Sequence, residues 1–581
     1  MNKDVILSFE FASSTGEICP HTFTNPVRVI SASTLEEVIP CLKMVQDAVE
    51  EGYYAAGYLS YESAPAFNEK FKVNPDNKMP LLWFGIFKEV SKKNVQSNGK
   101  YQVNPWKNST TIDDYNKSIQ SIKRAIKNGV TYQTNYTTRL YSKFQGDDFA
   151  FFEKLKRAQT SNYSAYLNIG DFRILSASPE LFFHMEEETI TTRPMKGTVK
   201  RGKTAEEDKE NAKWLYHSEK NRAENIMIVD LLRNDLSVIA QPTSVHVPKL
   251  FEIEQYPTVH QMTSTVQARV KDQTDLVDVF RALFPCGSIT GAPKISTMEI
   301  ISDLETTPRE VYCGAIGFIT PKKEAIFNVP IRTVVIEENT GIATYGAGGG
   351  ITWDSTKIGE YQEMLDKAKL LEEERPDFRL LESLLLEDGE YFLLEEHIHR
   401  LNNSAEYFGI PMNEDKVKTA FLKFAKRYES GQYKVRLLFS KNEEVELEAE
   451  SITDLDVPIK VMLANEPIEM ENLFYYHKTT NRTMYSRFQS KEGIYDLLLW
   501  NENKELTEFT IGNVVLKIGG ALWTPPIKCG LLAGTYREFL IATGKIKEKV
   551  LYVEDLESAE GIWLINSVRK WLPVKLVDKR V

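Results

Sequence analysis

The chain has 581 residues, and its 71 basic and 82 acidic side chains give a formal net charge of −11. Hydrophobic residues make up 42% and charged residues 26%, which is ordinary for a globular protein and excludes a fibrous or disordered chain. The acidic balance argues against a nucleic-acid binder, because contact with phosphates needs a basic surface. A few local cations would still suffice for small anionic ligands.

The sequence contains no obvious targeting or membrane segment. No run approaches the roughly 18 to 20 apolar residues of a membrane helix, and Val5-Ile6-Leu7 is too short for the core of a signal peptide. The five cysteines are few, odd in number and widely spaced, so we expect a cytoplasmic protein in a reducing compartment. Neither an HExxH motif nor a CxxC pair occurs, which argues against a transition-metal site.

The order of sequence patterns predicts two units. Length alone allows two to four domains at roughly 150 residues per domain. The charged stretch that begins at Glu360 predicts a helix that Pro376 ends, and a new pattern begins at Phe378. We therefore predict one unit over residues 1–375 and a second over residues 376–581.

Two short motifs in the first unit place a charged side chain beside a proline. In Ser178-Pro179-Glu180 the proline fixes the turn, so Glu180 occupies a defined corner. Lys196 lies between Pro194 and the conformationally permissive Gly197. A lysine in this position is a nucleophile if its neighbours lower its pKa from about 10.4, and otherwise an ordinary surface lysine in a turn.

Carboxylates at helical spacing form a second group of candidates. Glu224 lies near the start of a predicted helix, where it is either a partner of the helix dipole or a metal ligand. Glu360, Glu363 and Lys367 share one helix face, which suits either a solvated ladder of ion pairs or a cation site. Facing carboxylates from two helices would suit Mg²⁺, a hard ion with oxygen ligands.

Two glycine-rich stretches and an arginine suit an anionic ligand. The run YGAGGGI is not a dinucleotide fingerprint and GSITGAPK is not a P-loop, but both allow backbone N–H groups to approach an anion closely. Arg332, in FNVPIRT, offers a bidentate fork for a carboxylate.

Together these segments resemble the chorismate-utilising family over roughly residues 110 to 370. The matching runs, in chain order, are YQTNYTTRL, SASPELF, TRPMKGT, AENIMIVDLLRNDL, FPCGSITGAPK, YCGAIGF, FNVPIRT and YGAGGGI with GEYQE. The resemblance implies an α+β fold, in which a large chorismate-binding unit is built from antiparallel β-sheets with surrounding helices.

The resemblance also implies roles for individual residues. Mg²⁺ would be held through Glu224 and Glu363, with Glu360 close by, and would bind the ring carboxylate of chorismate. Glu180 resembles the general acid that helps the C4 hydroxyl to leave. The residues that resemble substrate contacts are Thr290, Tyr312, Arg332, Gly348, Gly349, Lys367 and His260, the last with a structural role as its alternative.

Two positions bear on the branch of the family. Gln133 stands where isochorismate and salicylate synthases resemble each other in having a lysine base, which points away from water as the nucleophile. Lys196 resembles the aminodeoxychorismate branch, whereas anthranilate synthases carry alanine there. Lys196 would attack C2 and displace the C4 hydroxyl, and ammonia at C4 would then expel the lysine. An anthranilate synthase with an appended domain is the alternative, but its Leu-Leu-Glu-Ser string occurs here only at residues 380–383, which we interpret as coincidence.

The second unit carries its own set of candidates. Asp388-Gly389 marks a hairpin turn, and Thr535 begins a predicted helix whose N-terminus suits a phosphate. Taken singly, Arg400 is a helix-surface cation, Lys478 a loop cation and Glu508 a charge at a strand edge.

Taken together, they resemble the class IV aminotransferase family, in its aminodeoxychorismate lyase branch, over about residues 378 to 574. The resemblance implies a two-layer, fold-type IV α/β unit in which Lys478 binds pyridoxal 5′-phosphate (PLP) covalently and Glu508 hydrogen-bonds its pyridine nitrogen. The residues implied to hold the phosphate are Arg400, Thr535, Tyr536 and Ser567. The opening strand segment of stand-alone members is missing before Phe378, and an appendage that only stabilises the first unit is the alternative.

The two resemblances meet chemically, since the product of the first unit would be the substrate of the second. We therefore predict an enzyme that converts chorismate and ammonia to 4-amino-4-deoxychorismate and then to 4-aminobenzoate and pyruvate for folate biosynthesis. No cysteine lies in a Gly-x-Cys-x-Gly elbow, so ammonia would come from solution or from a separate glutamine amidotransferase subunit. Class IV relatives are commonly dimers, which implies a homodimer through the C-terminal unit, and no nucleic-acid or membrane partner is expected.

Overall fold

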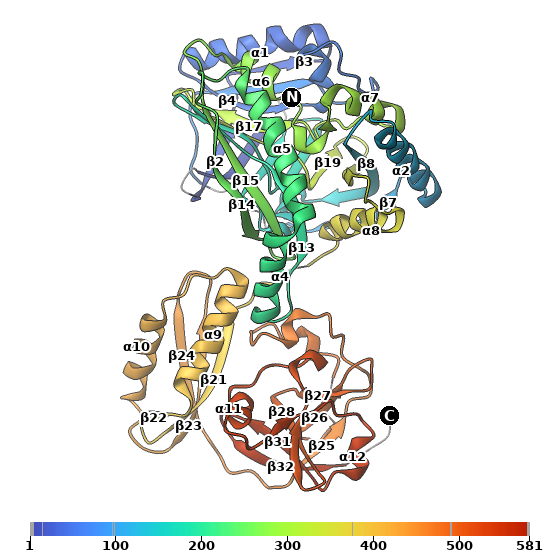
Figure 1. The fold of residues 1–581 in the computed structure, drawn as a ribbon. Helices are drawn as coiled ribbons and strands as arrows, with labels where there is room; N and C mark the ends of the chain where they lie inside the picture. Colours follow the sequence, from blue (N-terminus) through green and yellow to red (C-terminus); the bar gives the residue numbers. More distant parts are fainter. Residues whose placement is uncertain are drawn as a thin grey trace. The chain divides into compact units, whose positions relative to one another are not determined.

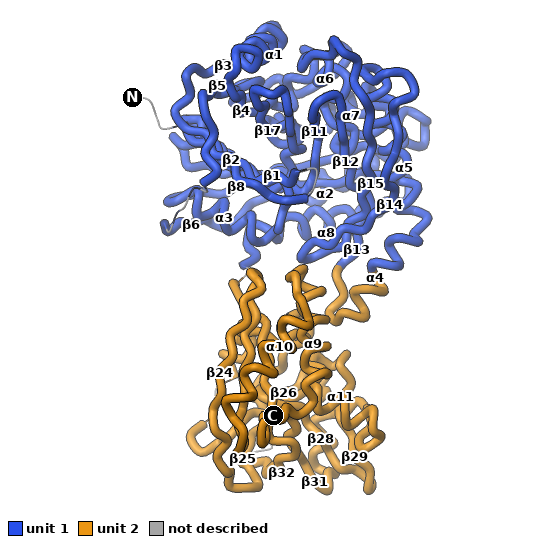
Figure 2. Tube along the Cα trace, turned by 90° about the vertical axis from the view of Figure 1, so that its left-hand side faces the viewer, with its two compact units in different colours: residues 1–200, 212–375 blue, residues 201–211, 376–581 orange. Residues whose placement is uncertain are grey.

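The computed structural model describes residues 5–13, 16–93, 95, 97, 99–374, 376–488 and 491–577. The chain divides into two compact units: unit 1 comprises residues 1–200 and 212–375, and unit 2 comprises residues 201–211 and 376–581 (Figure 2). Within the described part of the chain, no helix combines the length and the apolar character needed to cross a membrane.

Unit 1 contains two antiparallel sheets. The first has the order β16 (Gly291–Ala292), β8 (Gln133–Gly146), β20 (Ile342–Ile351), β19 (Thr333–Glu337), β10 (Phe172–Ser178), β9 (Tyr163–Asn168), β1 (Ile6–Ala12) and β2 (Ile18–Thr24), and β6 (Tyr101–Val103) and β7 (Lys107–Asn108) pair with β8. The second has the order β13 (Met195–Lys200), β15 (Val259–Arg269), β12 (Thr189–Arg193), β11 (Leu181–Glu186), β18 (Ala325–Asn328), β17 (Ala315–Ile319), β4 (Tyr54–Leu59), β5 (Leu82–Phe87) and β3 (Arg28–Ala32), and β14 (His246–Gln255) pairs with β15.

Aromatic side chains join the two sheets face to face. Phe9 and Phe23 of the first sheet pack with Phe318 of the second, and the rings of Phe9 and Phe318 lie 5.4 Å apart in an edge-on arrangement. Helices cover the outer faces through two further buried clusters. The predicted α+β architecture with antiparallel sheets is confirmed.

The helices of unit 1 are α1 (Leu35–Glu50), α2 (Ile112–Lys127), α3 (Asp148–Gln159), α5 (Glu219–Ser237), α6 (Leu276–Leu283), α7 (Lys294–Leu304) and α8 (Lys357–Ala368), and α4 (Ala205–His217) begins within residues assigned to unit 2. Helix α5 runs along β14 and β15 (Figure 1). The prediction that the helix after Glu360 continues to Pro376 is wrong, because Lys369–Leu371 form a 3-10 turn that buries Leu370 and Leu371 in the core.

Unit 2 has two layers of its own. A small sheet has the order β22 (Glu390–Tyr391), β21 (Leu380–Glu387), β23 (Gln432–Phe439) and β24 (Val445–Ser451), and α9 (Leu394–Phe408) and α10 (Glu414–Ala425) pack on one face. The larger sheet has the order β27 (Leu506–Phe509), β26 (Asp496–Trp500), β25 (Ile459–Leu463), β32 (Lys570–Leu576), β31 (Gly561–Asn566), β28 (Gly512–Ile518), β29 (Ala521–Thr524) and β30 (Lys547–Glu548), with α11 (Thr535–Ala542) and α12 (Asp555–Ser558). The predicted hairpin turn at Asp388-Gly389 is confirmed, since Glu387 pairs with Glu390 and both turn residues have positive φ.

Candidate functional sites

Lys196 lies on β13 at a bulge that interrupts the pairing of this strand with β15. Gly197, with a φ of 97°, adopts the left-handed conformation that the bulge requires. The amide of Asn225 on α5 donates to the Lys196 carbonyl at 3.3 Å, and the amide of Gln261 on β15 donates to the Gly197 carbonyl at 2.8 Å. The backbone that carries the lysine is therefore held from a helix and from a strand.

Burial sets the protonation of Lys196 and Glu180. Burial lowers the pKa of Lys196, and the nearby Glu180 carboxylate opposes this shift. Burial raises the pKa of Glu180 to about 7, opposed by a hydrogen bond with Ser288 and by the charge of Lys196. Among the described residues, Glu180 Oε1 is buried without a hydrogen-bond partner. Burial thus disfavours the charged form of each group, which shifts Lys196 toward a nucleophile and Glu180 toward a general acid, while their mutual attraction opposes both shifts.

Glu360, Glu363 and Lys367 converge on Gly349 of β20, as the shared helix face predicts. A Cβ atom at Gly349 would lie 3.2 Å from Glu363 Oε1, 3.4 Å from Glu360 Oε2 and 3.5 Å from Lys367 Nζ, so glycine leaves room for these groups. Lys367 Nζ donates to Glu363 Oε1 and to the Gly348 carbonyl, each at 2.7 Å. Lys367 lowers the pKa of Glu363, whereas burial raises the pKa of Glu360.

Glu224 of α5 belongs to the same electrostatic cluster. Burial raises its pKa, the charges of Lys196 and Lys220 lower it, and Glu363 raises it further. The oxygen donors of Glu224, Glu360 and Glu363 suit a hard cation such as Mg²⁺. In the part of the chain that the structure describes, these carboxylates are not gathered into a preformed metal-ligand group, since the Lys367 ammonium satisfies one oxygen of Glu363.

Gln133 of β8 and Lys196 of β13 meet on the same side of Gly350 of β20. A Cβ atom at Gly350 would lie 1.9 Å from Gln133 Nε2 and 3.1 Å from Lys196 Nζ. Strands β8 and β13 thus bring these two side chains together above the glycine-rich run of β20.

Tyr312 and Arg332 border this point from other directions. The Tyr312 ring packs on Gly346, where a Cβ atom would lie 2.5 Å away, and the guanidinium of Arg139 lies 5.2 Å from the ring centre. Arg332 donates from Nη1 to Gln159 Oε1 at 3.2 Å, and its charge contributes to the lowered pKa of Glu363.

Thr290 and His260 are both buried. The Thr290 hydroxyl donates to the carbonyls of Cys286 and Gly287, so it closes its own turn. His260 lies on β15 opposite Val199 of β13. Their roles as substrate contacts stay predictions.

A buried ion-pair cluster behind Tyr312 was not predicted from the sequence. Glu305 accepts from Arg309 Nη2 at 2.7 Å and from Arg139 Nη2 at 3.3 Å, and the side chains are almost wholly buried. It also accepts from the backbone N–H of Thr137 on β8 at 2.9 Å. The only sequence signal is the spacing of four between Glu305 and Arg309 beyond α7, which is common on ordinary helix surfaces.

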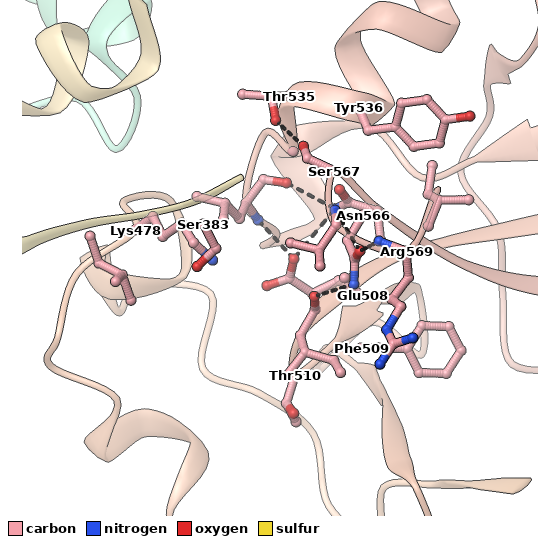
Figure 3. A pocket seen from close by; sticks show the side chains of 18 of the residues that line it. Ser383, Lys478, Glu508, Phe509, Thr510, Thr535, Tyr536, Asn566, Ser567 and Arg569 are labelled. Carbon is pink, nitrogen blue, oxygen red and sulfur yellow. Dashed lines mark hydrogen bonds between the residues drawn. The ribbon is translucent and has the colours of Figure 1, made fainter. Parts of the chain in front are cut away.

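Unit 2 encloses a cavity of about 490 Å³ that contains the residues predicted for PLP. The cavity is lined by Arg400, Lys478, Glu508, Thr535 and Ser567. Figure 3 shows all of these except Arg400 with labels. This volume is in the range of small-molecule sites.

In this cavity Glu508 is buried and Lys478 is partly buried. Burial and then the charge of Arg400 lower the pKa of Lys478 to about 8, so about a tenth of the amine is uncharged at pH 7, far more than for an ordinary lysine. Burial raises the pKa of Glu508 to about 8, opposed by the hydroxyl of Tyr485, which donates to Oε1 at 3.0 Å, and by the Leu532 N–H, which donates to Oε2 at 3.2 Å. A positively charged ring nitrogen beside Glu508 would lower the pKa of this carboxyl group and so favour the carboxylate.

The opposite end of the cavity suits a phosphate. Arg400 donates from Nε and Nη2 to Glu382 at 2.9 and 2.6 Å and from Nη1 to the Ala533 carbonyl at 3.0 Å, which leaves further N–H groups of its guanidinium for a ligand. Thr535 begins α11, and its hydroxyl oxygen lies 2.5 Å from that of Ser567. A cation, two hydroxyl groups and a helix N-terminus match the donor set that a phosphate requires.

His397 connects these groups and was not predicted as a functional residue. Its Nδ1 lies 2.6 Å from Glu382 Oε2, and its Nε2 lies 3.0 Å from the Thr535 hydroxyl oxygen. The spacing of three between His397 and Arg400 places both on one face of α9, and this was the available signal. Glu382, the acid of the Leu-Leu-Glu-Ser string, therefore has a structural role in unit 2.

The Tyr536 side chain points away from this end of the cavity. Its ring lies 5.6 Å from the ring of Phe392, in a small apolar cluster (Figure 3). The predicted phosphate contact of Tyr536, through the backbone at the start of α11, stays a prediction. The remaining residues fit PLP by their chemistry: an amine for the aldehyde, a carboxylate for the ring nitrogen and cationic donors for the phosphate.

Glu382→Gln is expected to lower the free energy of unfolding of unit 2 by about 3 kcal/mol, because it leaves Arg400 buried without its carboxylate. Burial would raise the pKa of Glu382, but Arg400 and His397 outweigh it and lower the pKa to about 2. This stabilisation is therefore present above the ordinary pKa of a glutamate and is lost as pH falls through about 2. Urea titration followed by near-ultraviolet circular dichroism would measure the change.

A matched control for this prediction is Glu446→Gln, whose ion pair with Arg379 is exposed. Its effect should stay within about 0.5 kcal/mol. Equal effects of the two substitutions would contradict the structural role assigned to Glu382.

Comparisons with known proteins agree with this geometry. The model of the chorismate binding enzyme family matches residues 10–373, and the model of amino-transferase class IV matches residues 379–577. Aminodeoxychorismate synthase component 1 of Salmonella typhimurium is 42% identical over 262 residues, which are 45% of this chain and 57% of that protein. Anthranilate synthase component 1 of Methanothermobacter marburgensis is 38% identical over 257 residues, which are 44% of this chain and 55% of that protein.

The chain thus spans a little over half the length of these curated relatives. The crystal structure of anthranilate synthase component I from Streptococcus pneumoniae TIGR4 superimposes with a TM-score of 0.53 at 24% identity and covers 64% of this chain and 93% of that chain, which supports the fold of unit 1. Both resemblances predicted from the sequence are confirmed. Since the first family model matches more than half of the residues, the chain belongs to the chorismate binding enzyme family and continues into a region that matches class IV amino-transferases.

Proposed function

We propose that the chain catalyses two successive reactions. Unit 1 converts chorismate and ammonia to 4-amino-4-deoxychorismate, and unit 2 converts that product to 4-aminobenzoate and pyruvate, as folate biosynthesis requires. The observation that carries the proposal is that each unit buries one lysine of lowered pKa beside a carboxyl group, Lys196 with Glu180 and Lys478 with Glu508. The identity to aminodeoxychorismate synthase component 1 of Salmonella typhimurium supports the first reaction.

In unit 1, Lys196 is the nucleophile and Glu180 the acid. The neutral Nζ forms a bond to C2 of chorismate, the ring electrons shift, and the C4–O bond breaks as Glu180 donates its proton to the departing hydroxyl, which leaves as water. Ammonia then forms a bond to C4, the electrons shift back, and the C2–N bond to Lys196 breaks. Two displacements leave the amino group on the carbon that carried the hydroxyl.

Glu224, Glu360 and Glu363 would hold Mg²⁺, which would neutralise a carboxylate of chorismate. Lys367 would have to release Glu363 for this purpose, since the two form an ion pair at 2.7 Å. Arg332 and the backbone of Gly348 and Gly349 orient the substrate carboxylates, and Tyr312 closes the site from the side of Gly346.

In unit 2, Lys478 holds PLP and afterwards moves the proton. PLP supplies an electron sink for the bond that breaks at C4. Glu508 would orient the ring nitrogen and stabilise its positive charge, while Arg400, Thr535 and Ser567 would hold the phosphate. Once released from PLP, Lys478 Nζ would accept the C4 proton of the substrate, the C3–O bond would break as the ring becomes aromatic, and the enolpyruvyl group would take up a proton and leave as pyruvate.

A separate glutamine amidotransferase subunit is the proposed source of ammonia. The motif of a glutaminase nucleophile is absent from the sequence, and the relative from Salmonella typhimurium is named as a component 1. The five free cysteines support the proposed cytoplasmic location. The homodimer through unit 2 stays a prediction.

Product analysis tests the proposed function directly. Full-length protein is given chorismate, Mg²⁺ and ammonium with and without PLP, and products are separated by liquid chromatography. We expect 4-aminobenzoate with PLP and a build-up of 4-amino-4-deoxychorismate without it. Anthranilate would establish the alternative synthase, and 4-amino-4-deoxychorismate that persists despite PLP would make unit 2 a structural appendage.

The synthase rate at constant free ammonia is expected to fall as pH rises above about 7. Burial raises the pKa of Glu180 to about 7, so the proton that it must donate is present below this pH and lost above it. On the acid side the rate should rise with pH, because Lys196 must lose its proton. Profiles of kcat/KM for chorismate against pH would measure both limbs.

Glu180→Gln is the matched variant for this profile. It should lower the maximum roughly 10²-fold and abolish the fall above neutral pH. A fall that persists unchanged in this variant would assign the upper limb to another group.

A further inference from the structure

One wall of the cavity in unit 2 carries three cationic side chains that the proposed PLP chemistry does not use. Arg436 and Lys434 lie two apart on β23, so both point to the same face of the small sheet. Arg569 follows β31 and lines the same cavity, where Figure 3 shows it beside Phe509. We call Arg436, Lys434 and Arg569 the cationic row.

Strand register orders the row along this wall. The Leu381 N–H donates to the Lys478 carbonyl at 3.0 Å, and Ser383, two residues further along β21, pairs with Arg436. Lys434 pairs with Glu450 on β24, and the Thr453 carbonyl just beyond β24 accepts from Arg569. Arg436 therefore lies on the strand next to β21, which contacts Lys478. Lys434 and Arg569 are joined to β24 and to the residues that follow it.

The carboxylates near the row bind it weakly. Arg436 lies 3.9 Å from Glu448 and Lys434 lies 3.9 Å from Glu450, and the two glutamate side chains are 58% and 80% exposed. Pairs of this length and exposure contribute little. Among the residues that the structure describes, no carboxylate forms an ion pair with Arg569, whose partner is the Thr453 carbonyl.

The charge of the whole cavity is also unbalanced. Seven of its lining residues are Lys or Arg and two are Glu, and within the described part of the chain only Arg400 and Arg537 of the seven form close ion pairs with glutamates outside the lining. PLP would engage Arg400 through its phosphate and Lys478 through its aldehyde, and it would leave the row without an anion. A cavity lined by one sign of charge concentrates ligands of the opposite sign.

We propose that the cationic row binds the carboxylates of the substrate, so that unit 2 selects a ring amine with two carboxylates over an ordinary amino acid. This inference rests on the proposed function of unit 2. 4-Amino-4-deoxychorismate carries one carboxylate on the ring and one on its enolpyruvyl group, and a row of cations reaches both. The guanidinium forks of Arg436 and Arg569 match the geometry of a carboxylate.

Arg436→Met and Arg569→Met in the full-length holoenzyme test the row. Each should raise KM for 4-amino-4-deoxychorismate roughly tenfold to a hundredfold with a smaller change in kcat, while PLP content measured by absorbance stays unchanged. Binding of 4-aminobenzoate and of uncharged 4-aminobenzamide, followed by the PLP spectrum, isolates the charge. Wild type should prefer the carboxylate about tenfold or more, and Arg436→Met should lose the preference.

Controls separate the row from a general charge effect. Lys426→Met removes an exposed cation after α10, outside the cavity, and should change neither KM nor the preference. Arg436→Lys keeps the charge without the fork and should give an intermediate KM. Unchanged KM and preference in both methionine variants, with an active wild type, would overturn the inference. An inactive wild type would refute the proposed lyase, whereas a carboxylate preference lost in Arg436→Met would still support the row.

Discussion

Lys478→Ala is expected to stop the full-length protein at 4-amino-4-deoxychorismate. Lys478 is partly buried, its pKa is lowered to about 8, and Lys434 is the only other lysine among the described residues that line this cavity. Formation of 4-aminobenzoate should fall by roughly three orders of magnitude or more, because one side chain both anchors the cofactor and moves the proton. The conversion of chorismate should continue at the wild-type rate. Liquid chromatography of chorismate, intermediate and product over time gives all three quantities.

Borohydride reduction adds a readout that is independent of turnover. Wild type should acquire a permanent PLP adduct on the peptide that contains Lys478, and Lys478→Ala should acquire none. Lys423→Ala, an exposed lysine on α10, is the control and should behave as wild type in both assays. Full 4-aminobenzoate production by Lys478→Ala would remove Lys478 from the mechanism.

Lys196→Ala is expected to abolish the first reaction even when ammonium replaces the amidotransferase. Burial lowers the pKa of Lys196, and the bulge at Gly197 with its hydrogen bonds to α5 and β15 holds the side chain in place. Loss of the nucleophile should lower the rate of chorismate consumption by roughly three orders of magnitude. Added 4-amino-4-deoxychorismate should still be converted to 4-aminobenzoate by unit 2.

Two further variants separate a nucleophile from a positive charge. Lys196→Arg keeps the charge but presents a guanidinium that stays protonated, so it should be as inactive as Lys196→Ala if the amine forms a bond. Lys200→Ala, at the exposed end of the same strand, should retain activity. Substantial activity of Lys196→Arg would reduce Lys196 to an electrostatic role, and full activity of Lys196→Ala would refute the covalent mechanism.

Local sequence patterns predicted the individual parts of both sites. The spacing of Glu360, Glu363 and Lys367 predicted a shared helix face, and Asp388-Gly389 predicted a hairpin turn. Such signals succeed because helix periodicity and turn conformation depend on neighbours in the chain. The predicted end of α8 at Pro376 was wrong. The helix ends at Ala368, because the next residues form a 3-10 turn that buries Leu370 and Leu371 in the core.

Contacts between residues that are far apart in the sequence could not be predicted from such local patterns. His397 was not predicted as functional because its hydrogen bonds are to Glu382 and Thr535, which lie in other elements. The cluster of Glu305 with Arg139 and Arg309 was not predicted either, because its burial depends on packing against β8. A charged residue on a helix looks the same in sequence whether it is solvated or buried.

The sequence by itself indicated two units, the two family resemblances and the residue types proposed for the chemistry, because ordered motifs and turn residues are local properties of the chain. Tertiary structure decided the charge states. Desolvation lowers the pKa of Lys196 and Lys478 and raises that of Glu180 and Glu508, and it acts only when distant strands close over these groups. For this reason the net charge of −11 does not predict the charge of this cavity, which is lined by seven basic and two acidic residues. Composition averages over the chain, whereas a binding site depends on the few charges that folding brings together.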